Sequence, residues 1–257
     1  MTQLAFITGA SSGIGQALAW EFYHAGYAVA LVARNQAAMQ QWVAERGLQP
    51  TRCAIYAADV SQPESIQAAA QRCLENQGLP DVVIANAGIS IGMDSAIAAD
   101  LNTMARIFAT NNLGLAASFQ PFIAPMRSRG HGHLVGIASV AGIRGLPGHG
   151  AYCGSKAAVI AYCESLRGEL RGSGVQVQTI APGFIDTPMT RDNPYPMPFL
   201  MPVADFARAA RHAIESGAGY RVIPWQMGWV AKLLRIMPNA LFDAAFAGRG
   251  RKPRQPQ

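Results

Sequence analysis

Short apolar runs alternate with helix-like patterns along nearly the whole chain, and this alternation restricts the fold more than any other feature. The apolar runs are continuous, which is typical of strands buried in a parallel sheet. Strands are expected at residues 4–8, 28–33, 52–57, 81–85, 134–138, 175–180 and 220–223, and helices at 14–25, 36–46, 64–76, 101–127, 150–171 and 203–217. This order predicts an α/β fold: a doubly wound, seven-stranded parallel sheet with helices on both faces.

Prolines interrupt this pattern in two places. Pro121 and Pro125 are expected to bend or end the last turns of the helix over 101–127. Residues 182–202 are so rich in proline that they cannot be regular, and long irregular loops in compact domains are often lids. We therefore expect one domain over 1–224 with a substrate lid at 184–202, a helical extension of the same domain over 225–247, and a disordered basic tail over 248–257.

Charge and cysteine usage exclude several classes of protein. The net charge is +6, but four positive charges lie in the tail at Arg249, Arg251, Lys252 and Arg254, so the body lacks the basic surface that nucleic-acid binding requires. The cysteines form no CxxC pair and are expected to be free thiols of a cytoplasmic protein. His131 and His133 have no third ligand nearby, so no metal site is expected. We see no leader before Leu4 and no apolar run that can span a bilayer.

A glycine-rich turn stands between the first expected strand and the first expected helix, with the sequence TGASSGIG at residues 8–15. Glycines let the main chain approach a pyrophosphate, and the N–H groups at the start of the helix bind the anion. The strand before and the helix after are the context that this motif requires. We therefore expect a dinucleotide, held here by Gly9, Ser11, Ser12, Gly13, Ile14 and Gly15.

The end of the second expected strand bears on the choice between NAD and NADP. Enzymes that prefer NAD usually place an acid there for the ribose 2′-hydroxyl, whereas an Arg suits the 2′-phosphate of NADP. The chain has no acid at Val32, Ala33 or Asn35 and carries Arg34. Because a guanidinium offers five donors and a permanent charge, Arg34 predicts NADP(H). The alternative is a solvated surface Arg.

Tyr152 and Lys156 lie four residues apart at the start of an expected helix, so the phenol and the ammonium share one face. A free Tyr is a poor acid near neutral pH, but a nearby cation lowers its pKa. Such a Tyr can protonate a carbonyl oxygen while hydride arrives at the carbon, or deprotonate an alcohol in reverse. Ser139 follows an expected strand, at the sheet edge where ligands bind, and is positioned to hydrogen-bond the substrate oxygen.

Together these residues resemble the single-domain Tyr–Lys branch of the short-chain dehydrogenase/reductase family. Residues 8–15 resemble its TGxxxGxG loop, Asp59-Val60 its adenine contact and Asn86-Ala87-Gly88 its NAG motif. Asn111 with Gly114 resembles its NxxG motif, Ser139 stands thirteen positions before Tyr152 as the catalytic serine does, and Pro182-Gly183 with Thr187 resembles its PGxxxT segment. The resemblance covers about residues 4–223 and implies a Rossmann fold with strand order 3-2-1-4-5-6-7, the cofactor crossing the switch point.

The resemblance also implies a role for each matching residue. Tyr152 would be the general acid and base, and Lys156 would bind the nicotinamide ribose and lower the pKa of Tyr152. Ser139 would polarise the carbonyl. Asn111, rather than its neighbour Asn112, would hold a water that links Lys156 to solvent. The remaining cofactor-binding residues would be Arg34, Asp59, Val60, Asn86, Ala87, Gly88, Tyr152, Lys156, Pro182, Gly183, Ile185 and Thr187.

The substrate is less restricted than the reaction. Residues 195–201 are strongly apolar, so the leading hypothesis is an NADPH-dependent carbonyl reductase or alcohol dehydrogenase for an apolar or lipid-like small molecule. His149 would border the same pocket. One alternative is a 3-oxoacyl thioester (acyl-carrier) reductase. Another is a non-catalytic NADP-sensing protein, against which the complete set of catalytic residues argues.

The C-terminal extension leaves three alternatives open. Its apolar residues fall on one helical stripe, with Lys232 and Arg235 off it; they are Trp229, Val230, Leu233, Leu234 and Met237. Residues 225–254 would contact an anionic membrane surface, cover the protein's own pocket, or form an interface of a homodimer or homotetramer. The expected location is the cytoplasm, with or without this peripheral membrane contact.

Overall fold

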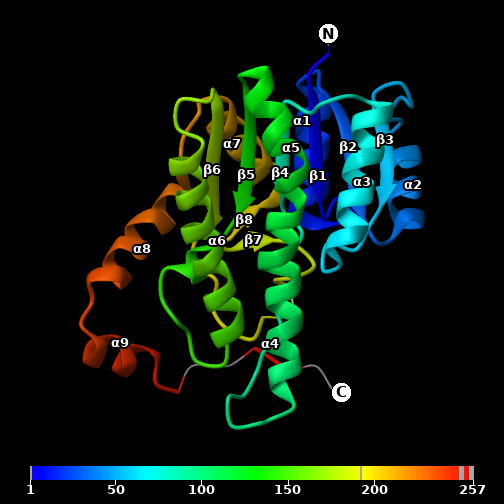
Figure 1. The fold of residues 1–257 in the computed structure, drawn as a ribbon. Coiled ribbons are helices and arrows are strands. Elements are labelled where there is room, and N and C mark those ends of the chain that lie inside the picture. Colours follow the sequence, from blue (N-terminus) through cyan, green and yellow to red (C-terminus); the bar gives the residue numbers. More distant parts are fainter. Residues whose placement is uncertain (1, 192, 249–251, 255–257) are drawn as a thin grey trace.

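Seven parallel strands form the central sheet of the computed structural model, which describes residues 2–191, 193–248 and 252–254. They run in the order β3-β2-β1-β4-β5-β6-β9 (Figure 1). Their bounds are β1 Leu4–Thr8, β2 Ala28–Ala33, β3 Cys53–Ala57, β4 Val82–Ala85, β5 Gly132–Ile137, β6 Val175–Pro182 and β9 Tyr220–Ile223. The predicted α/β fold and strand order are confirmed; the seventh strand is β9 because two short strands of the lid precede it.

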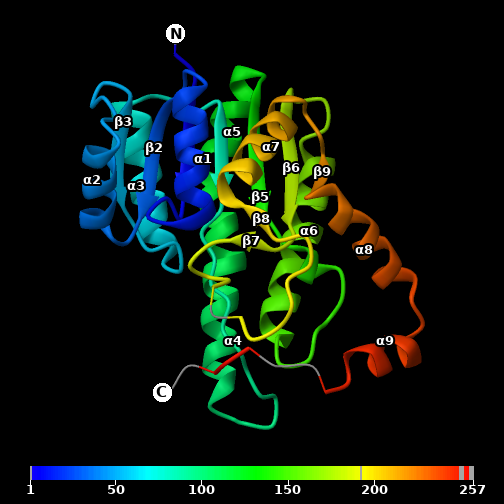
Figure 2. The same ribbon diagram turned by 180° about the vertical axis from the view of Figure 1, so that it is seen from behind.

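Helices cover both faces of the sheet (Figures 1 and 2). One face carries α3 (Pro63–Asn76), α4 (Asp100–Phe108), α5 (Gly114–Arg129) and α6 (Gly150–Glu169), and the other carries α1 (Gly13–His24), α2 (Gln36–Glu45) and α7 (Val203–Glu215). Neighbouring residues of β1 serve opposite faces, since Phe6 packs in the first layer and Ile7 in the second. Burial of each such side chain contributes roughly 1.5–3 kcal/mol to stability.

The long helix expected over 101–127 is divided, but not by its prolines. A π-helical turn, η1 (Ala109–Leu113), separates α4 from α5. Pro121 and Pro125 lie inside α5, which continues to Arg129, so of the two predicted outcomes, a bend or an end of the helix, the second does not occur. Three side chains of α5 are fully buried, and this burial offsets the cost of the two missing N–H donors; they are Phe119, Phe122 and Met126.

The lid and the extension pack outside the main layers. In the lid, β7 (Ile185–Asp186) pairs in parallel with β8 (Met201–Pro202), and the described residues between them are irregular. The extension consists of α8 (Trp225–Ile236) and α9 (Asn239–Phe246), which break at Pro238. Arg144 fastens this break, since its guanidinium donates to the Leu234 carbonyl at 2.7 Å and lies 4.3 Å over the Phe242 ring.

The basic tail differs from its prediction. Residues 252–254 are not free of the body but lie against the loop that follows β4, with Gly92 and Arg254 forming a parallel bridge. Residues 249–251 and 255–257 lie outside the described part of the chain. Within that part, no helix has the length and apolar character that a membrane crossing requires.

Candidate active site

The glycine-rich turn between β1 and α1 is tied to the loop that follows β4. The Thr8 hydroxyl accepts hydrogen bonds from the main-chain N–H groups of Asn86 (3.0 Å) and Ala87 (3.1 Å). The Asn86 side-chain amide donates in return to the Thr8 carbonyl at 2.9 Å. Because β1 and β4 are neighbours, the predicted motifs at 8–15 and 86–88 meet at the carboxyl edge of the sheet, where ligands of such sheets bind.

Close main-chain approach explains the glycines of this turn. A Cβ on Gly9 would lie 2.8 Å from Asn86 Nδ2, and the φ of 69° at Gly9 is one that other residues rarely adopt. A Cβ on Gly15 would overlap the Gly9 carbonyl. Ser12 makes no side-chain cap to α1, whose first turn has no acidic residue. These N–H groups are therefore available to an anion, and the cradle fits the pyrophosphate of a dinucleotide.

The first residues of the lid, around Thr187, lie close to the glycine turn. A Cβ on Gly13 would lie 3.5 Å from the Thr187 Cβ, so Thr187 stands over the start of α1. Ser11 and Ile14 belong to the same turn, and Ile14 packs with the core that also buries Ile185. The predicted residues of the glycine loop and of the lid thus face one another across a narrow gap.

The segment that enters the lid is fixed by the last strand and by α8. Pro182 ends β6, and the N–H of Gly183 donates to the Ile223 carbonyl at 2.8 Å. A Cβ on Gly183 would lie 2.6 Å from the Met227 Cγ of α8. The PG pair therefore turns the chain away from the sheet at a point where only glycine fits.

Arg34 stands at the carboxyl end of β2, one residue beyond the strand. Its side chain is 74% exposed, and its Nη1 lies 3.8 Å from Asp59 Oδ2. An exposed pair at this distance contributes little to stability, so the guanidinium is available to a ligand. Asp59 is held in place by Ser61, whose N–H and hydroxyl donate to its Oδ1 at 2.9 and 2.7 Å. The structure thus brings Arg34 and Asp59 together at one end of the site.

The π-turn η1 brings Asn111 and Lys156 under the loop after β4. A Cβ on Gly88 would lie 3.2 Å from Asn111 Oδ1 and 3.4 Å from Lys156 Nζ. A Cβ on Gly114 would lie 2.6 Å from the Val60 carbonyl, so this glycine lets η1 and α5 approach the chain after β3. Predicted residues from four separate motifs are therefore in contact.

Asn111 is buried and its side-chain amide is fully used. Its Oδ1 accepts from the Ile89 N–H (2.8 Å), and its Nδ2 donates to the Ile89 carbonyl (3.0 Å) and to the Ser155 hydroxyl (2.9 Å). Asn112 points elsewhere and donates to the Ser155 carbonyl at 2.8 Å. The geometry therefore places Asn111, and not Asn112, beside Lys156.

Lys156 and Tyr152 lie on the same face of α6, as their spacing predicts. The Lys156 ammonium lies 5.9 Å from the centre of the Tyr152 ring and donates to the Ile137 carbonyl at 2.8 Å. Burial lowers the pKa of Lys156 to about 8. Ser139 follows β5 directly and hydrogen-bonds Tyr152, which by itself lowers the pKa of the phenol. The three side chains thus converge at the carboxyl edge of the sheet.

The expectation that the pKa of Tyr152 is lowered is wrong, since its pKa is raised. Burial raises the pKa of Tyr152 to about 12, the Ser139 hydrogen bond opposes this rise only in part, and Lys156 is not among the groups that shift it. The physical reason is that loss of hydration penalises the phenolate more than neighbouring groups stabilise it. At neutral pH the Tyr152 hydroxyl therefore keeps its proton.

An aromatic and apolar wall surrounds Tyr152. The His149 ring lies 5.7 Å from that of Tyr195, which lies 6.4 Å from that of Phe184. Ile91 and Met93, in the loop after β4, form a small buried cluster with residues of α4 and α6. Met93 also lines a hollow of about 320 Å³ between this loop and the start of α6. The predicted place of His149 beside the pocket agrees with this geometry.

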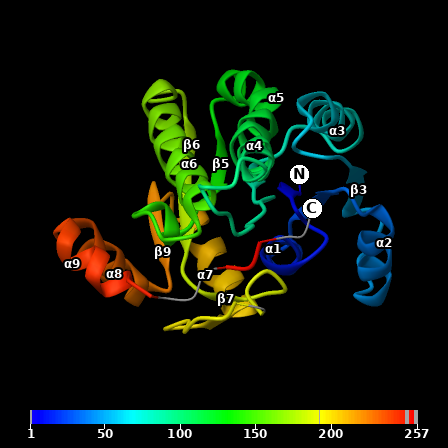
Figure 3. The same ribbon diagram turned by 90° about the horizontal axis from the view of Figure 1, so that it is seen from below.

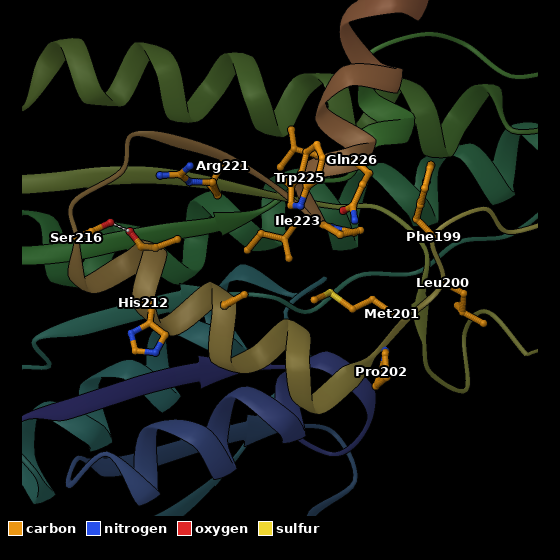
Figure 4. Close-up of a pocket in the computed structure, with 14 residues that line it drawn as sticks. Phe199, Leu200, Met201, Pro202, His212, Ser216, Arg221, Ile223, Trp225 and Gln226 are labelled. Atoms are coloured by element: carbon orange, nitrogen blue, oxygen red, sulfur yellow. Dashed lines mark hydrogen bonds between the residues drawn. The ribbon is translucent and has the colours of Figure 1, made fainter.

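A larger groove lies elsewhere, along the edge of the sheet. It measures about 700 Å³ and runs between α7 on one side and β9 with the start of α8 on the other (Figure 4). Phe199, Leu200 and Met201 of the lid line it, together with Trp225. The apolar segment predicted to line the substrate pocket is therefore divided: Tyr195 faces the catalytic side chains, whereas Phe199 to Met201 face this groove.

The sequence analysis missed several residues around the site. Ser155 was overlooked although it anchors Asn111, because a serine inside a helix carries no distinctive signal. Asp100, Lys252 and Arg254 were missed as a group, since a short basic tail is usually solvated. A buried acid at the start of a helix was the available signal, because such an acid requires a partner. Among the described residues, no His, Cys, Asp and Glu side chains gather in a way that could hold a metal ion.

Comparisons with known proteins agree with this geometry. The family model for short chain dehydrogenases matches residues 3–196. A Myxococcus xanthus protein described as an uncharacterized oxidoreductase is 36% identical over 241 residues, covering 94% of this chain and 95% of the relative.

Two solved structures share the fold. One is a short chain dehydrogenase/reductase from Burkholderia phymatum in complex with NAD, with a TM-score of 0.82, 24% identity, and coverage of 100% of this chain and 98% of that chain. The other is an alcohol dehydrogenase from the archaeon Thermococcus sibiricus complexed with 5-hydroxy-NADP, with a TM-score of 0.77, 26% identity, and coverage of 87% and 96%. From the matched motifs, the sheet order and these relatives together, the chain belongs to the short-chain dehydrogenase/reductase family of oxidoreductases.

Proposed function

We propose that this protein is an NADPH-dependent carbonyl reductase that also runs the reverse alcohol oxidation. The observation that carries the proposal is the convergence of Tyr152, Lys156 and Ser139 beside a cradle that fits a dinucleotide. Three groups are needed to polarise and protonate a carbonyl oxygen: a proton donor, which is Tyr152, a cation, which is Lys156, and a second hydroxyl, which is that of Ser139.

The proposed cofactor site runs along the carboxyl edge of the sheet. Gly9, Ser11, Ser12, Gly13, Ile14 and Gly15 hold the pyrophosphate, and Asp59 and Val60 border the adenine. Asn86, Ala87 and Gly88 line the middle of the site, and Pro182, Gly183, Ile185 and Thr187 meet the nicotinamide end. When bound, the cofactor supplies or accepts the hydride. The residues of the chain bind the cofactor and transfer the proton to or from the substrate oxygen.

NADP(H) rather than NAD(H) is the cofactor that Arg34 favours. Its guanidinium is exposed, only loosely paired with Asp59, and stands at the strand end where the ribose 2′-position lies. A bidentate contact with phosphate is the strongest use of such a group. No acid competes for the 2′-position within β2 or at Asn35.

In the reduction, Tyr152 donates the proton to the carbonyl oxygen while Ser139 hydrogen-bonds the same oxygen. The high pKa of Tyr152 keeps this proton available over the whole neutral range. Lys156 supplies positive charge beside the phenol and binds the ribose hydroxyls. Asn111, which is buried beside Lys156, would hold the water that links Lys156 to solvent.

The substrate is an apolar carbonyl compound. Tyr195 lies near the phenol of Tyr152, Phe184 packs near Tyr195, and Ile91 and Met93 form a buried cluster with Ala151, the neighbour of Tyr152. Such a lining binds hydrocarbon and excludes water, and a few polar groups then fix the orientation of the carbonyl.

Tyr152→Phe tests the mechanism. The change removes the hydroxyl and little else, so we expect turnover of carbonyl substrates to fall by about 10³-fold while the Kd for NADPH stays within about twofold. Tyr162→Phe, on the same helix but partly exposed to solvent, is the control and should behave as wild type. NADPH absorbance measures turnover, and protein fluorescence measures NADPH binding. Turnover that survives the first change excludes Tyr152 as the proton donor.

A second proposal concerns the extension. Trp229, Leu233 and Ile236 project from one face of α8, and each is more than half exposed. Lys232 and Arg235 flank the face, and α8 has no acidic residue. We propose that this face contacts an anionic membrane surface, since aromatic rings and flanking cations suit the headgroup region.

A further inference from the structure

The C-terminal tail crosses the carboxyl edge of the sheet and docks beside the proposed active site. Seen from below, its short red segment runs between the loop before α4 and the lid (Figure 3). Arg254 holds it there, with Nε and Nη2 donating at 2.8 Å each to the two carboxylate oxygens of Asp100. Asp100 is 3% exposed and accepts a further hydrogen bond from the Asp94 N–H at 2.7 Å. Two parallel charged hydrogen bonds to a buried acid form a specific anchor.

The main chain of the tail also fits a shaped seat. The Gly92 N–H donates to the Pro253 carbonyl at 3.3 Å. A Cβ at position 92 would overlap the Lys252 carbonyl, so the seat exists only because residue 92 is glycine. A side-chain anchor and a main-chain seat therefore fix the position of Lys252 from both sides.

This docking places the Lys252 ammonium between two loops of the site. Its Nζ donates to the Ser90 hydroxyl at 3.1 Å and lies 3.5 Å from the Met189 carbonyl. Ser90 follows the Gly88 loop, and Met189 follows Thr187 in the lid. Burial lowers the pKa of the His149 imidazole, which packs against Tyr195, and the positive charge of Lys252 lowers it further. Lys252 thus faces the side of the site that holds Tyr152 and its apolar wall.

The two groups that the Lys252 ammonium contacts, the Ser90 hydroxyl and the Met189 carbonyl, are both neutral. Within the described residues no carboxylate forms an ion pair with it, and burial lowers the pKa of its ammonium. Loss of water around a cation is unfavourable unless an opposite charge replaces it. The Lys252 ammonium is therefore a fixed cation without a carboxylate partner among the described residues, and a bound anion would neutralise its charge.

We propose that Lys252 is a specificity-determining residue that binds a carboxylate on the carbonyl substrate. The inference rests on the proposed function and refines it: the substrate has an apolar body, a reacting carbonyl and an anionic group. The cofactor phosphates are the other possible source of anionic oxygen. The contact with Ser90 and the effect on His149 place Lys252 on the substrate side, so we assign the charge to the substrate.

The test uses pairs of probes that differ only in charge, namely 4-oxopentanoate and 4-oxodecanoate with their methyl esters. Calorimetry measures their binding to the full-length protein saturated with NADP+, which cannot reduce them, and NADPH absorbance measures their reduction in a separate assay. We expect wild type to bind each acid at least about tenfold more tightly than its ester, the size of one well-placed charged contact. Lys252→Met should remove this preference while changing ester affinity by less than about twofold.

Two further variants separate the charge from other effects. Gly92→Ala displaces the tail without removing any charge and should lose the same preference. Lys232→Met removes a cation on the exposed face of α8 and should behave as wild type. The Kd for NADPH should stay within about twofold in all three, which also reports that the fold is intact.

Each contrary result has a definite meaning. The inference is wrong if no acid binds better than its ester, or if Lys252→Met weakens NADPH instead of the acids, in which case the charge serves the cofactor. Reduction of neutral carbonyls alone leaves the proposed reaction standing and overturns this inference. Preferential binding of the acids without any NADPH oxidation supports Lys252 as the anion site and overturns the proposed reaction.

Discussion

Two regions of this molecule, the one with the proposed cofactor site (the cofactor half) and the one with the proposed substrate site (the substrate half), are built on different physical principles. Around the glycine turn, position is set by main chain: Thr8 and Asn86 bond each other's backbone, and Gly9 and Gly15 leave no space for a side chain. Around the lid, the extension and the tail, position is set by side chains from distant segments, such as Arg144 on α8 and Arg254 on Asp100.

This difference affects how each half tolerates change. A main-chain cradle has no spare volume, so even one added methyl group must move backbone. The substrate half is held by side-chain contacts between distant segments. It can lose one such contact and keep the fold, because these segments lie outside the core. Substrate choice is therefore free to vary in the second half while cofactor binding stays fixed in the first.

Replacing Gly15 with alanine should break the cofactor half and give the largest effect. The new Cβ would overlap the Gly9 carbonyl, so we expect the affinity for NADPH to fall by at least about 100-fold, or the protein to be clearly less stable. Gly168→Ala is the control, since a Cβ on this helical glycine meets nothing within 4 Å. Fluorescence titration and thermal unfolding measure the two properties. Unchanged NADPH affinity in the Gly15 variant means that the cradle is not the pyrophosphate site.

Arg34→Asp tests the one part of the cofactor half that depends on an exposed side chain. Exchange of cation for anion should weaken NADPH and strengthen NADH, and we expect the ratio of their affinities to change by about 10- to 100-fold. Arg171→Asp makes the same charge change at a distant exposed position. If the ratio stays constant, Arg34 does not read the ribose 2′-phosphate.

The pH dependence of NADPH binding should sharpen the comparison further. Because the pKa of Lys156 is about 8, its ammonium loses its proton as the pH rises through that value. If the charged form is the one that binds, the affinity for NADPH should be nearly constant below about pH 7, fall by about twofold between pH 7 and 8, and fall by about fivefold between pH 8 and 9. Lys156→Met should be weaker throughout and show no such step. A step of equal size in that variant assigns the titration to another group.

The exposed face of α8 should give the smallest effect on the purified enzyme. Replacing Trp229 and Leu233 with serine should change the free energy of unfolding by less than about 0.5 kcal/mol, because both side chains face solvent. The same change should abolish flotation with vesicles that contain anionic lipid. If wild type and variant float equally, the membrane proposal is wrong, and light scattering then tests whether the face joins two copies instead.

The sequence alone predicted the fold around the proposed cofactor site well, namely the strands and their order. Continuous apolar runs identify buried parallel strands, and the residues of the glycine turn and of the YxxxK pair act through local spacing, so their positions follow from the chain itself. The strand order and the meeting of residues 8–15 with 86–88 come from the rules of parallel sheets and from the resemblance to a family.

The remainder depends on contacts between distant segments, which no local pattern records. The tail was expected to be disordered because its charges suit solvent, yet a buried Asp100 that lies far away in the sequence provides the partner for Arg254. The pKa of Tyr152 was expected to fall because Lys156 is near, yet burial by surrounding elements raises it. Pro121 and Pro125 were expected to bend or end their helix, yet α5 continues through both to Arg129.

The docked tail has a practical consequence for work with this protein. Arg254 binds Asp100 beside the proposed active site, so an affinity tag that follows the tail closely would compete with this docking. The first strand begins at the opposite edge of the sheet, remote from the catalytic side chains (Figure 1). A tag for purification therefore belongs in front of β1, and kinetic data from a C-terminally tagged preparation would describe a partly obstructed enzyme.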